Sequence, residues 1–129
     1  MKPEDVHEPV KDEEPDHPVA TAWRPTFHAI VSAFVRRDYG LAAGVPSVDR
    51  PSSEEADQFE SYIRSYGETL AELPDETWST SIAQWTGSHW DVFVDLWTAE
   101  SGRSDMILDA RVSEVKGGFR IAIHLVYVP

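Results

Sequence analysis

The stretch Trp90-Asp91-Val92-Phe93-Val94-Asp95-Leu96-Trp97-Thr98 (residues 90–98) carries an apolar side chain at every second position as far as Leu96. Positions 90, 92, 94 and 96 carry Trp, Val, Val and Leu, whereas positions 91, 93, 95 and 97 carry Asp, Phe, Asp and Trp. A period of two is typical of a β-strand that buries one face, because successive side chains point to opposite sides of the sheet. The stretch therefore predicts a strand at the centre of the fold.

Three further segments around it show the same period. In the first, larger side chains alternate with small ones from Trp78 to Gln84; in the others, apolar residues alternate from Met106 to Val112 and from Phe119 to Tyr127. The separators are short: Gly87-Ser88-His89, residues 100–104 and Gly117-Gly118. Connections of this length permit antiparallel hairpins and exclude parallel crossovers. We therefore expect a four-stranded antiparallel meander.

Two segments before the strands have helical spacing. In the first, Thr21 is the expected N-cap, Pro25 lies in the first turn, and Gly40 supplies the terminating left-handed residue. The apolar face of the first helix is Trp23, Phe27, Ile30, Val31, Phe34 and Val35. In the second, Ser52 and Glu55 have the spacing of a capping box, and the apolar face reaches Leu73 before Pro74. The predicted fold class is α+β, with two N-terminal helices packed on one face of the sheet in a two-layer sandwich.

The length of 129 residues suits one domain. Residues 1–18 hold seven acidic and two basic side chains and four of the nine prolines, with few apolar groups. Such a composition does not bury enough surface to offset its ordering entropy. We predict a flexible acidic, Pro-rich tail over residues 1–18 and a single α+β domain over residues 19–129.

The charge balance excludes several classes of function. The chain has 23 acidic and 11 basic residues, a net charge of −12. This argues against nucleic-acid binding and against docking on an anionic membrane. Cysteine is absent, so thiolate metal sites and thiol nucleophiles are excluded. No long apolar run or signal peptide is present, and the expected location is the cytoplasm. With no phosphate loop, dinucleotide fingerprint or His-Glu-x-x-His motif, we expect no cofactor and no metal.

Alternation also defines the second face of the predicted sheet. That face mixes large apolar groups with acids, arginines and a histidine, unlike an ordinary solvated face. It is a partly covered outer face, a ligand or partner surface, or a catalytic face. The candidate binding residues on it are Trp85, Asp91, Phe93, Asp95, Trp97, Asp105, Ile107, Asp109, Arg111 and His124.

Two registers remain open for the second and third strands. Pairing Leu96 with Leu108 sets Asp95 opposite Asp109, which would raise one carboxyl pKa and suit acid–base chemistry or a hard cation. A two-residue slip instead places Asp91 beside Arg111 and leaves no acidic pair. A Gly117-Gly118 turn would set Arg111 across from His124.

The turn Gly87-Ser88-His89 places a serine next to a histidine. It lacks the Gly-x-Ser-x-Gly pattern of a nucleophile elbow, and adjacent turn residues seldom act as a nucleophile pair. It is a weak candidate for catalysis.

Four segments resemble a family of small bacterial domains of unknown function. They are Leu73-Pro74-Asp75-Glu76-Thr77-Trp78, residues 90–98, Gly102-Arg103-Ser104-Asp105 and Val126-Tyr127-Val128-Pro129. The resemblance covers about residues 18–129 and implies a bacterial cytoplasmic protein. It implies no activity, ligand or catalytic residue.

The acidic charge, small size and missing catalytic motif favour a non-enzymatic protein-interaction module. In concrete form this is an immunity-like or antitoxin-like binder of a basic partner such as a nuclease. One alternative is a small-ligand or metal-dependent enzyme that uses Asp91, Asp95, Asp105, Asp109 and His124. Another is a self-associating structural protein, such as a homodimer that stacks its second faces.

Overall fold

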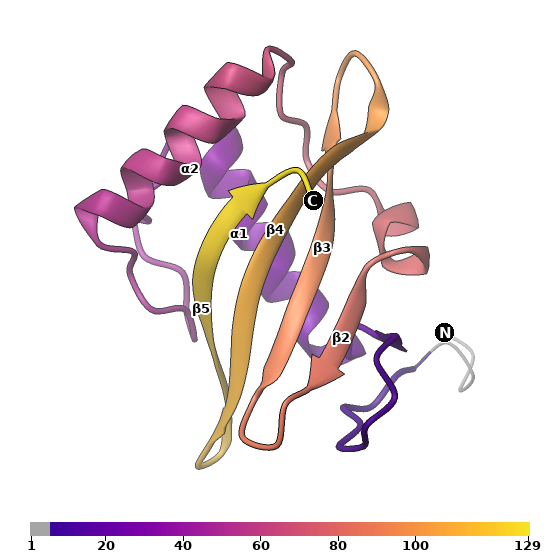
Figure 1. The fold of residues 1–129 in the computed structure, drawn as a ribbon. Helices are drawn as coiled ribbons and strands as arrows, with labels where there is room; N and C mark the ends of the chain where they lie inside the picture. Colours follow the sequence, from indigo (N-terminus) through magenta and orange to yellow (C-terminus); the bar gives the residue numbers. More distant parts are fainter. Residues whose placement is uncertain (1–5) are drawn as a thin grey trace.

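The computed structural model describes residues 6–129, in which two helices pack on one side of an antiparallel sheet. Figure 1 shows the sheet in front and α1 behind it. The elements are β1 (His17–Pro18), η2 (Thr21–Trp23), α1 (Arg24–Val35), α2 (Ser53–Tyr66), η3 (Asp75–Ser79), β2 (Ile82–Trp85), β3 (Trp90–Thr98), β4 (Gly102–Val115) and β5 (Gly118–Tyr127). The α+β class is therefore confirmed.

The sheet has five strands in the order β1-β2-β3-β4-β5, and every pairing is antiparallel. The prediction of four strands missed β1, which pairs His17 with Ala83 and Pro18 with Ile82. Because β1 precedes α1, the helices do not precede the whole sheet. The strand β1 has only two residues and lies in an acidic, Pro-rich segment, so it has no period-two pattern from which the sequence could predict it.

Both helices end at residues other than those expected. The Ser52–Glu55 capping box is present, but α2 ends at Tyr66, because Gly67 takes the left-handed conformation (φ 85°) and caps it. At the end of α1 the left-handed residue is Arg37 (φ 66°), not Gly40. Thr21 begins the short helix η2 and does not cap α1, whose N-cap is Trp23.

The β3–β4 register is the one that leaves no acidic pair. Asp91 lies across from Arg111, and Asp95 lies across from Ile107. The alternative that pairs Asp95 with Asp109 is wrong. The register shifts between Asp95 and Trp97, close to the turn that joins β3 to β4. This bulge sets which residues pair along the rest of the two strands.

The β4–β5 hairpin also differs from expectation. Val115 pairs with Gly118, so the turn is Lys116-Gly117, with Gly117 at φ 84°. Arg111 consequently lies across from Ala122 and not His124, and that predicted pairing is wrong. A second shift between Asp109 and Ala110 leaves His124 as the extra residue of a bulge in β5.

Two face assignments change as a result. After the bulge at His124, Val126 is fully buried, whereas Leu125 and Tyr127 lie on the outer face. In the first predicted strand, η3 takes up Asp75–Ser79, and β2 starts only at Ile82. Ala83 then faces the core, and Trp85 lies beside Trp90 on the helix side. The assignment of Trp85 to the second face is therefore wrong.

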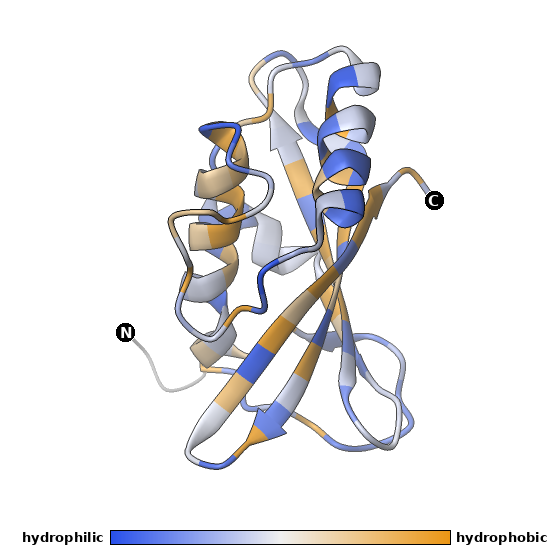
Figure 2. Ribbon diagram, turned by 90° about the vertical axis from the view of Figure 1, so that its left-hand side faces the viewer, coloured by the Kyte–Doolittle hydropathy of each residue, from blue (hydrophilic) through white to orange (hydrophobic). Residues whose placement is uncertain are grey.

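The core lies between the sheet and the two helices. The alternation of hydropathy along the strands is visible in Figure 2. Val92 and Val94 of β3 and Leu108 and Ala110 of β4 are fully buried, as the period-two pattern predicts. Phe27, Phe34 and Phe59 cover them from the helices.

The segment before β1 contacts this core. The Trp90 indole N–H donates to the Val10 carbonyl at 2.9 Å, and the Lys11 ammonium lies 5.2 Å from the Trp85 ring centre. Lys11 also pairs with Glu114 of β4. The predicted boundary after residue 18 therefore divides β1 and these contacts from the rest of the domain. Residues 1–5 of the predicted tail lie outside the described residues.

No helix among the described residues is long and apolar enough to cross a membrane.

Candidate functional site

Five apolar side chains lie next to one another on the sheet face that is turned away from the helices. The register sets Ile82 across from Phe93, and Ile107 across from Tyr127. Leu125 completes the group, and all are half-buried. We call them the outer patch: Ile82, Phe93, Ile107, Leu125 and Tyr127. Figure 1 looks onto this face, and no described helix crosses it.

Asp109 lies in the middle of the outer patch. Phe93 is its partner on β3 and Leu125 its partner on β5. Directly opposed side chains in a sheet have Cβ atoms about 5 Å apart. Ile107 and Arg111 precede and follow Asp109 by two residues on the same face of β4. The carboxylate thus has apolar neighbours on three sides and a guanidinium on the fourth.

The surroundings of Asp109 disfavour its charged form. Burial raises the pKa of the Asp109 carboxyl above its ordinary value. The charge of His124 lowers the pKa, that of Asp91 raises it, and that of Arg111 lowers it. Within residues 6–129 the carboxylate accepts no hydrogen bond and forms no ion pair. A half-buried carboxylate without a partner lowers the stability of the folded state. Its presence is therefore not explained by folding stability alone.

The other acidic candidates are engaged or peripheral. The Asp95 carboxylate accepts a hydrogen bond from the Thr80 hydroxyl, and its main-chain N–H donates to Ser81 Oγ at 2.9 Å. Thr80 and Ser81 directly precede β2, and their side chains bond to Asp95 of β3 in place of main-chain pairing. Asp105 is exposed, and its N–H donates to the Tyr66 hydroxyl. The candidate acids therefore do not converge: Asp109 lies inside the patch, and the others lie around it.

Trp97 differs from the rest of the candidate set. Its ring packs against the core and lies so close to Gly102 that a Cβ built there would be 3.6 Å from it. Its buried indole N–H has no acceptor in the described part of the chain. Trp97 follows the bulge at the far end of β3, so it borders the outer patch and does not form its centre.

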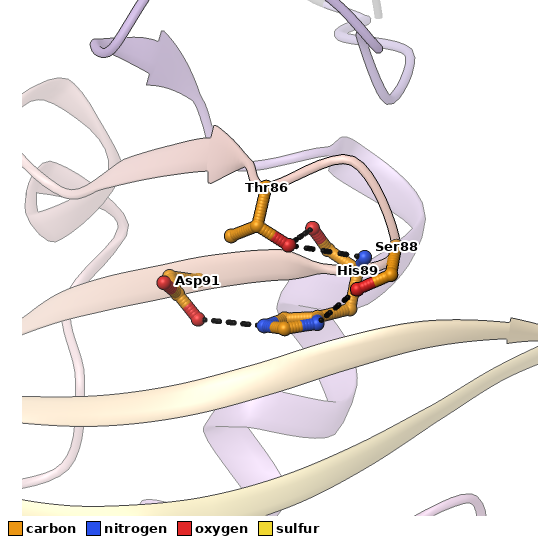
Figure 3. Close-up of polar contacts among 4 residues, drawn as sticks. All are labelled: Thr86, Ser88, His89 and Asp91. Atoms are coloured by element: carbon orange, nitrogen blue, oxygen red, sulfur yellow. Dashed lines mark hydrogen bonds and ion pairs between the residues drawn. The ribbon is translucent and has the colours of Figure 1, made fainter.

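A polar chain closes the β2–β3 turn (Figure 3). Ser88 Oγ lies 3.0 Å from His89 Nδ1, and His89 Nε2 lies 3.1 Å from Asp91 Oδ1. Thr86 bonds the main chain of His89 through both its N–H and its hydroxyl. These contacts fix the orientation of the His89 imidazole and engage one carboxylate oxygen of Asp91. Asp91 therefore helps to stabilise the turn, and it lies at the rim of the outer patch. Ser88, His89 and Asp91 are thus consecutive members of one hydrogen-bonded chain that runs from the turn into the start of β3.

Other segments of the chain bond the main chain of β5 at its outer edge. The Gln58 side chain makes two bonds to the main chain of Val126: Nε2 donates to the carbonyl at 2.8 Å, and Oε1 accepts from the N–H at 3.1 Å. Ile121 is bonded on the same edge by the main chain of Ser47 and Asp49. An edge whose main-chain groups are occupied offers little to a further strand.

No metal centre is formed by the described residues: within 6–129 no group of three or more His, Asp or Glu side chains is placed to hold an ion. The register that would set Asp95 opposite Asp109, and so suit a hard cation, is not the one observed.

Three members of the outer patch do not follow from the sequence pattern. Alternation predicts Ile82, Leu125 and Tyr127 on the helix side, because a period of two carries no sign of a bulge or of a late strand start. Leu125-Val126-Tyr127 is apolar at every position, so no signal in the sequence distinguishes its two faces.

These features define a small α+β protein with a partly covered edge at β5 and an apolar sheet face that holds an acid without a partner among residues 6–129. Comparison with protein families matches residues 31–129 to a domain of unknown function, DUF7668. The chain belongs to this family, in agreement with the resemblance described above. Neither the curated proteins nor the solved structures that were searched contain a match to the chain.

Proposed function

We propose that this protein is a non-enzymatic interaction module that binds a basic protein through the outer patch. One observation carries the proposal: Asp109 lies half-buried and unpaired, within the described residues, between Phe93 and Leu125. An apolar centre with a desolvated anion fits a partner that inserts a lysine or arginine among apolar groups. The cation would compensate the charge that burial leaves poorly solvated.

The charge of the whole chain supports a basic partner over a second copy. At −12, two copies repel each other over long range, whereas a cationic protein is attracted. Asp91, Asp95 and Asp105 surround the patch with further negative charge. In its concrete form the proposal is an immunity-like or antitoxin-like protein of the bacterial cytoplasm that masks a basic effector such as a nuclease.

The test is capture from an extract of the native host with tagged protein and three variants. Phe93→Ser and Asp109→Asn alter the patch. Val115→Ser is the matched control, because Val115 is 41% exposed at the tip of the β4–β5 hairpin, away from the patch. Circular dichroism and thermal unfolding establish that each variant is folded before it is used.

We expect the wild type and Val115→Ser to retain the same strongly basic protein. Phe93→Ser and Asp109→Asn should weaken its binding at least about tenfold, because central contacts dominate interface energies. Added salt should also weaken binding. A partner that binds all four proteins equally contradicts the proposal. Concentration-dependent dimerisation that Phe93→Ser abolishes would instead favour the self-associating protein.

A further inference from the structure

A second feature lies where both helices end. A cavity of about 410 Å³ is lined by the last residues of α1 and α2 and by the segment that follows α2. This volume is within the usual range for small-molecule sites. Its apolar lining includes Phe34, Val35, Ile63 and Leu70. The polar groups around it are Arg37, Tyr39, Glu60, Arg64, Glu68 and Thr69.

Arg37 has an uncommon conformation for a side chain of its kind. It occupies the left-handed position (φ 66°) of a helix-terminating motif, in which its N–H donates to the Phe34 carbonyl and the Asp38 N–H donates to the Ala33 carbonyl. Glycine is the usual residue here, because a Cβ is strained at positive φ. A residue that holds a strained backbone at a cavity wall is a candidate for function through its side chain.

Arg37 is also the cation of the cavity that has no partner in the part of the chain described. Arg64 Nη2 pairs with Glu60 Oε2 at 2.9 Å. Glu68 accepts hydrogen bonds from the hydroxyls of Thr98 (2.7 Å) and Ser101 (2.8 Å). The Asp38 carboxylate accepts from the N–H groups of Ala42 and Ala43. One guanidinium thus remains for a ligand.

The two helix ends bring the opposite charge. A helix C-terminus carries a partial negative charge, and cations are stabilised beside it. Val35 and Gly67, at the ends of α1 and α2, both line the cavity. A simple anion would be repelled by these two helix ends and by the net charge of −12 of the chain. A molecule with one charge of each sign can place its anionic group at Arg37 and its cationic group at the helix ends.

We propose that this cavity binds a small zwitterion with an apolar side group, as in a free α-amino acid. The ligand carboxylate pairs with Arg37, its ammonium group lies at the C-terminal ends of the helices, and its side group covers Val35 and the Phe34–Tyr39 ring pair, whose centres are 5.5 Å apart. The inference depends on the cavity alone and is independent of the outer patch.

The test compares L-phenylalanine with two probes that each lack one of its charged groups: 3-phenylpropanoate, which lacks the ammonium group, and phenethylamine, which lacks the carboxylate. Binding is measured by calorimetry and by the NMR amide shifts of Arg37, Gly67 and Thr69. Arg37→Gln removes the proposed contact. Arg36→Gln is the control, since Arg36 is the neighbouring exposed arginine and does not line the cavity. Arg37→Gly removes the same side chain and relieves the backbone strain.

We expect L-phenylalanine to shift these amides and to bind at least about tenfold more tightly than either single-charge probe. Arg37→Gln and Arg37→Gly should abolish the shifts, Arg36→Gln should retain them, and Arg37→Gly should melt no lower than the wild type. Absence of binding by L-phenylalanine, equal binding of 3-phenylpropanoate or phenethylamine, or unchanged binding to Arg37→Gln would each overturn the inference.

Discussion

Asp109 lies directly across from Phe93 in the β3–β4 ladder, and this pairing places a carboxylate against an aromatic ring on the open face of the sheet. The same register keeps Asp109 away from Asp95, so the two acids do not face each other. A surface acid that weakens the fold is the kind of residue that function retains.

Asp109→Asn should stabilise the protein at neutral pH. Burial raises the pKa of this carboxyl, so the folded state holds the proton more tightly than the unfolded state, and stability falls as the pH rises from the unfolded to the folded pKa. The amide removes this penalty. Urea unfolding at pH 7 should give a higher midpoint for Asp109→Asn, and the gain should vanish below the unfolded pKa of about 3.9. A gain of equal size at both pH values would contradict the assignment.

Two isoleucines on opposite faces test the assignment of the core. Ile123→Ala, at a position 4% exposed on the helix side of β5, should lower the free energy of unfolding by about 2–5 kcal/mol. Ile107→Ala, in the half-buried outer patch, should cost less than about 2 kcal/mol, because less surface is buried there. Chemical denaturation measures both. Equal losses would mean that the outer patch is a second core layer.

The segment before β1 should contribute to stability. Composition alone predicts that its deletion changes little, but the contacts of Val10 and Lys11 with Trp90 and Trp85 predict otherwise. Deletion of the residues before Asp16 removes a partly buried hydrogen-bond acceptor and a cation over two aromatic rings. We expect a loss of about 1–3 kcal/mol, measured by thermal and urea unfolding. An unchanged melting temperature would show that these contacts contribute nothing.

Gln58→Leu should uncover the edge of β5. The Val126 N–H and carbonyl would lose their side-chain partners, at a cost of about 1–3 kcal/mol, and the free edge should promote association. Gln84→Leu is the matched control, because Gln84 is exposed on β2 and no hydrogen bond within the described residues involves its side chain. Urea unfolding and light scattering provide the readout, and a variant that stays as stable and monodisperse as Gln84→Leu would argue against the capping role.

The sequence predicts those features of the fold that depend on neighbouring residues in the chain. Alternation identified the buried row of β3, and capping chemistry identified Ser52 as the start of α2. The bulge at His124 and the turn at Lys116-Gly117 could not be predicted, because each depends on the neighbouring strand and shifts every later residue. Alternation therefore predicts the outer-face positions of Phe93, Asp109 and Ile107 correctly. It wrongly puts Leu125 and Tyr127 on the helix side, because of the bulge, and Trp85 on the outer face, because β2 starts late.

The central claim is that the outer patch recognises a cation within an apolar surface, and selection from a random peptide display library tests it most directly. Immobilised wild type and Val115→Ser should enrich peptides in which Lys or Arg is flanked by apolar residues. Asp109→Asn, although more stable, should lose this enrichment, and Phe93→Ser should bind the selected peptides at least about tenfold more weakly. Peptides that bind Asp109→Asn as tightly as the wild type, or that carry no basic residue, would contradict the account.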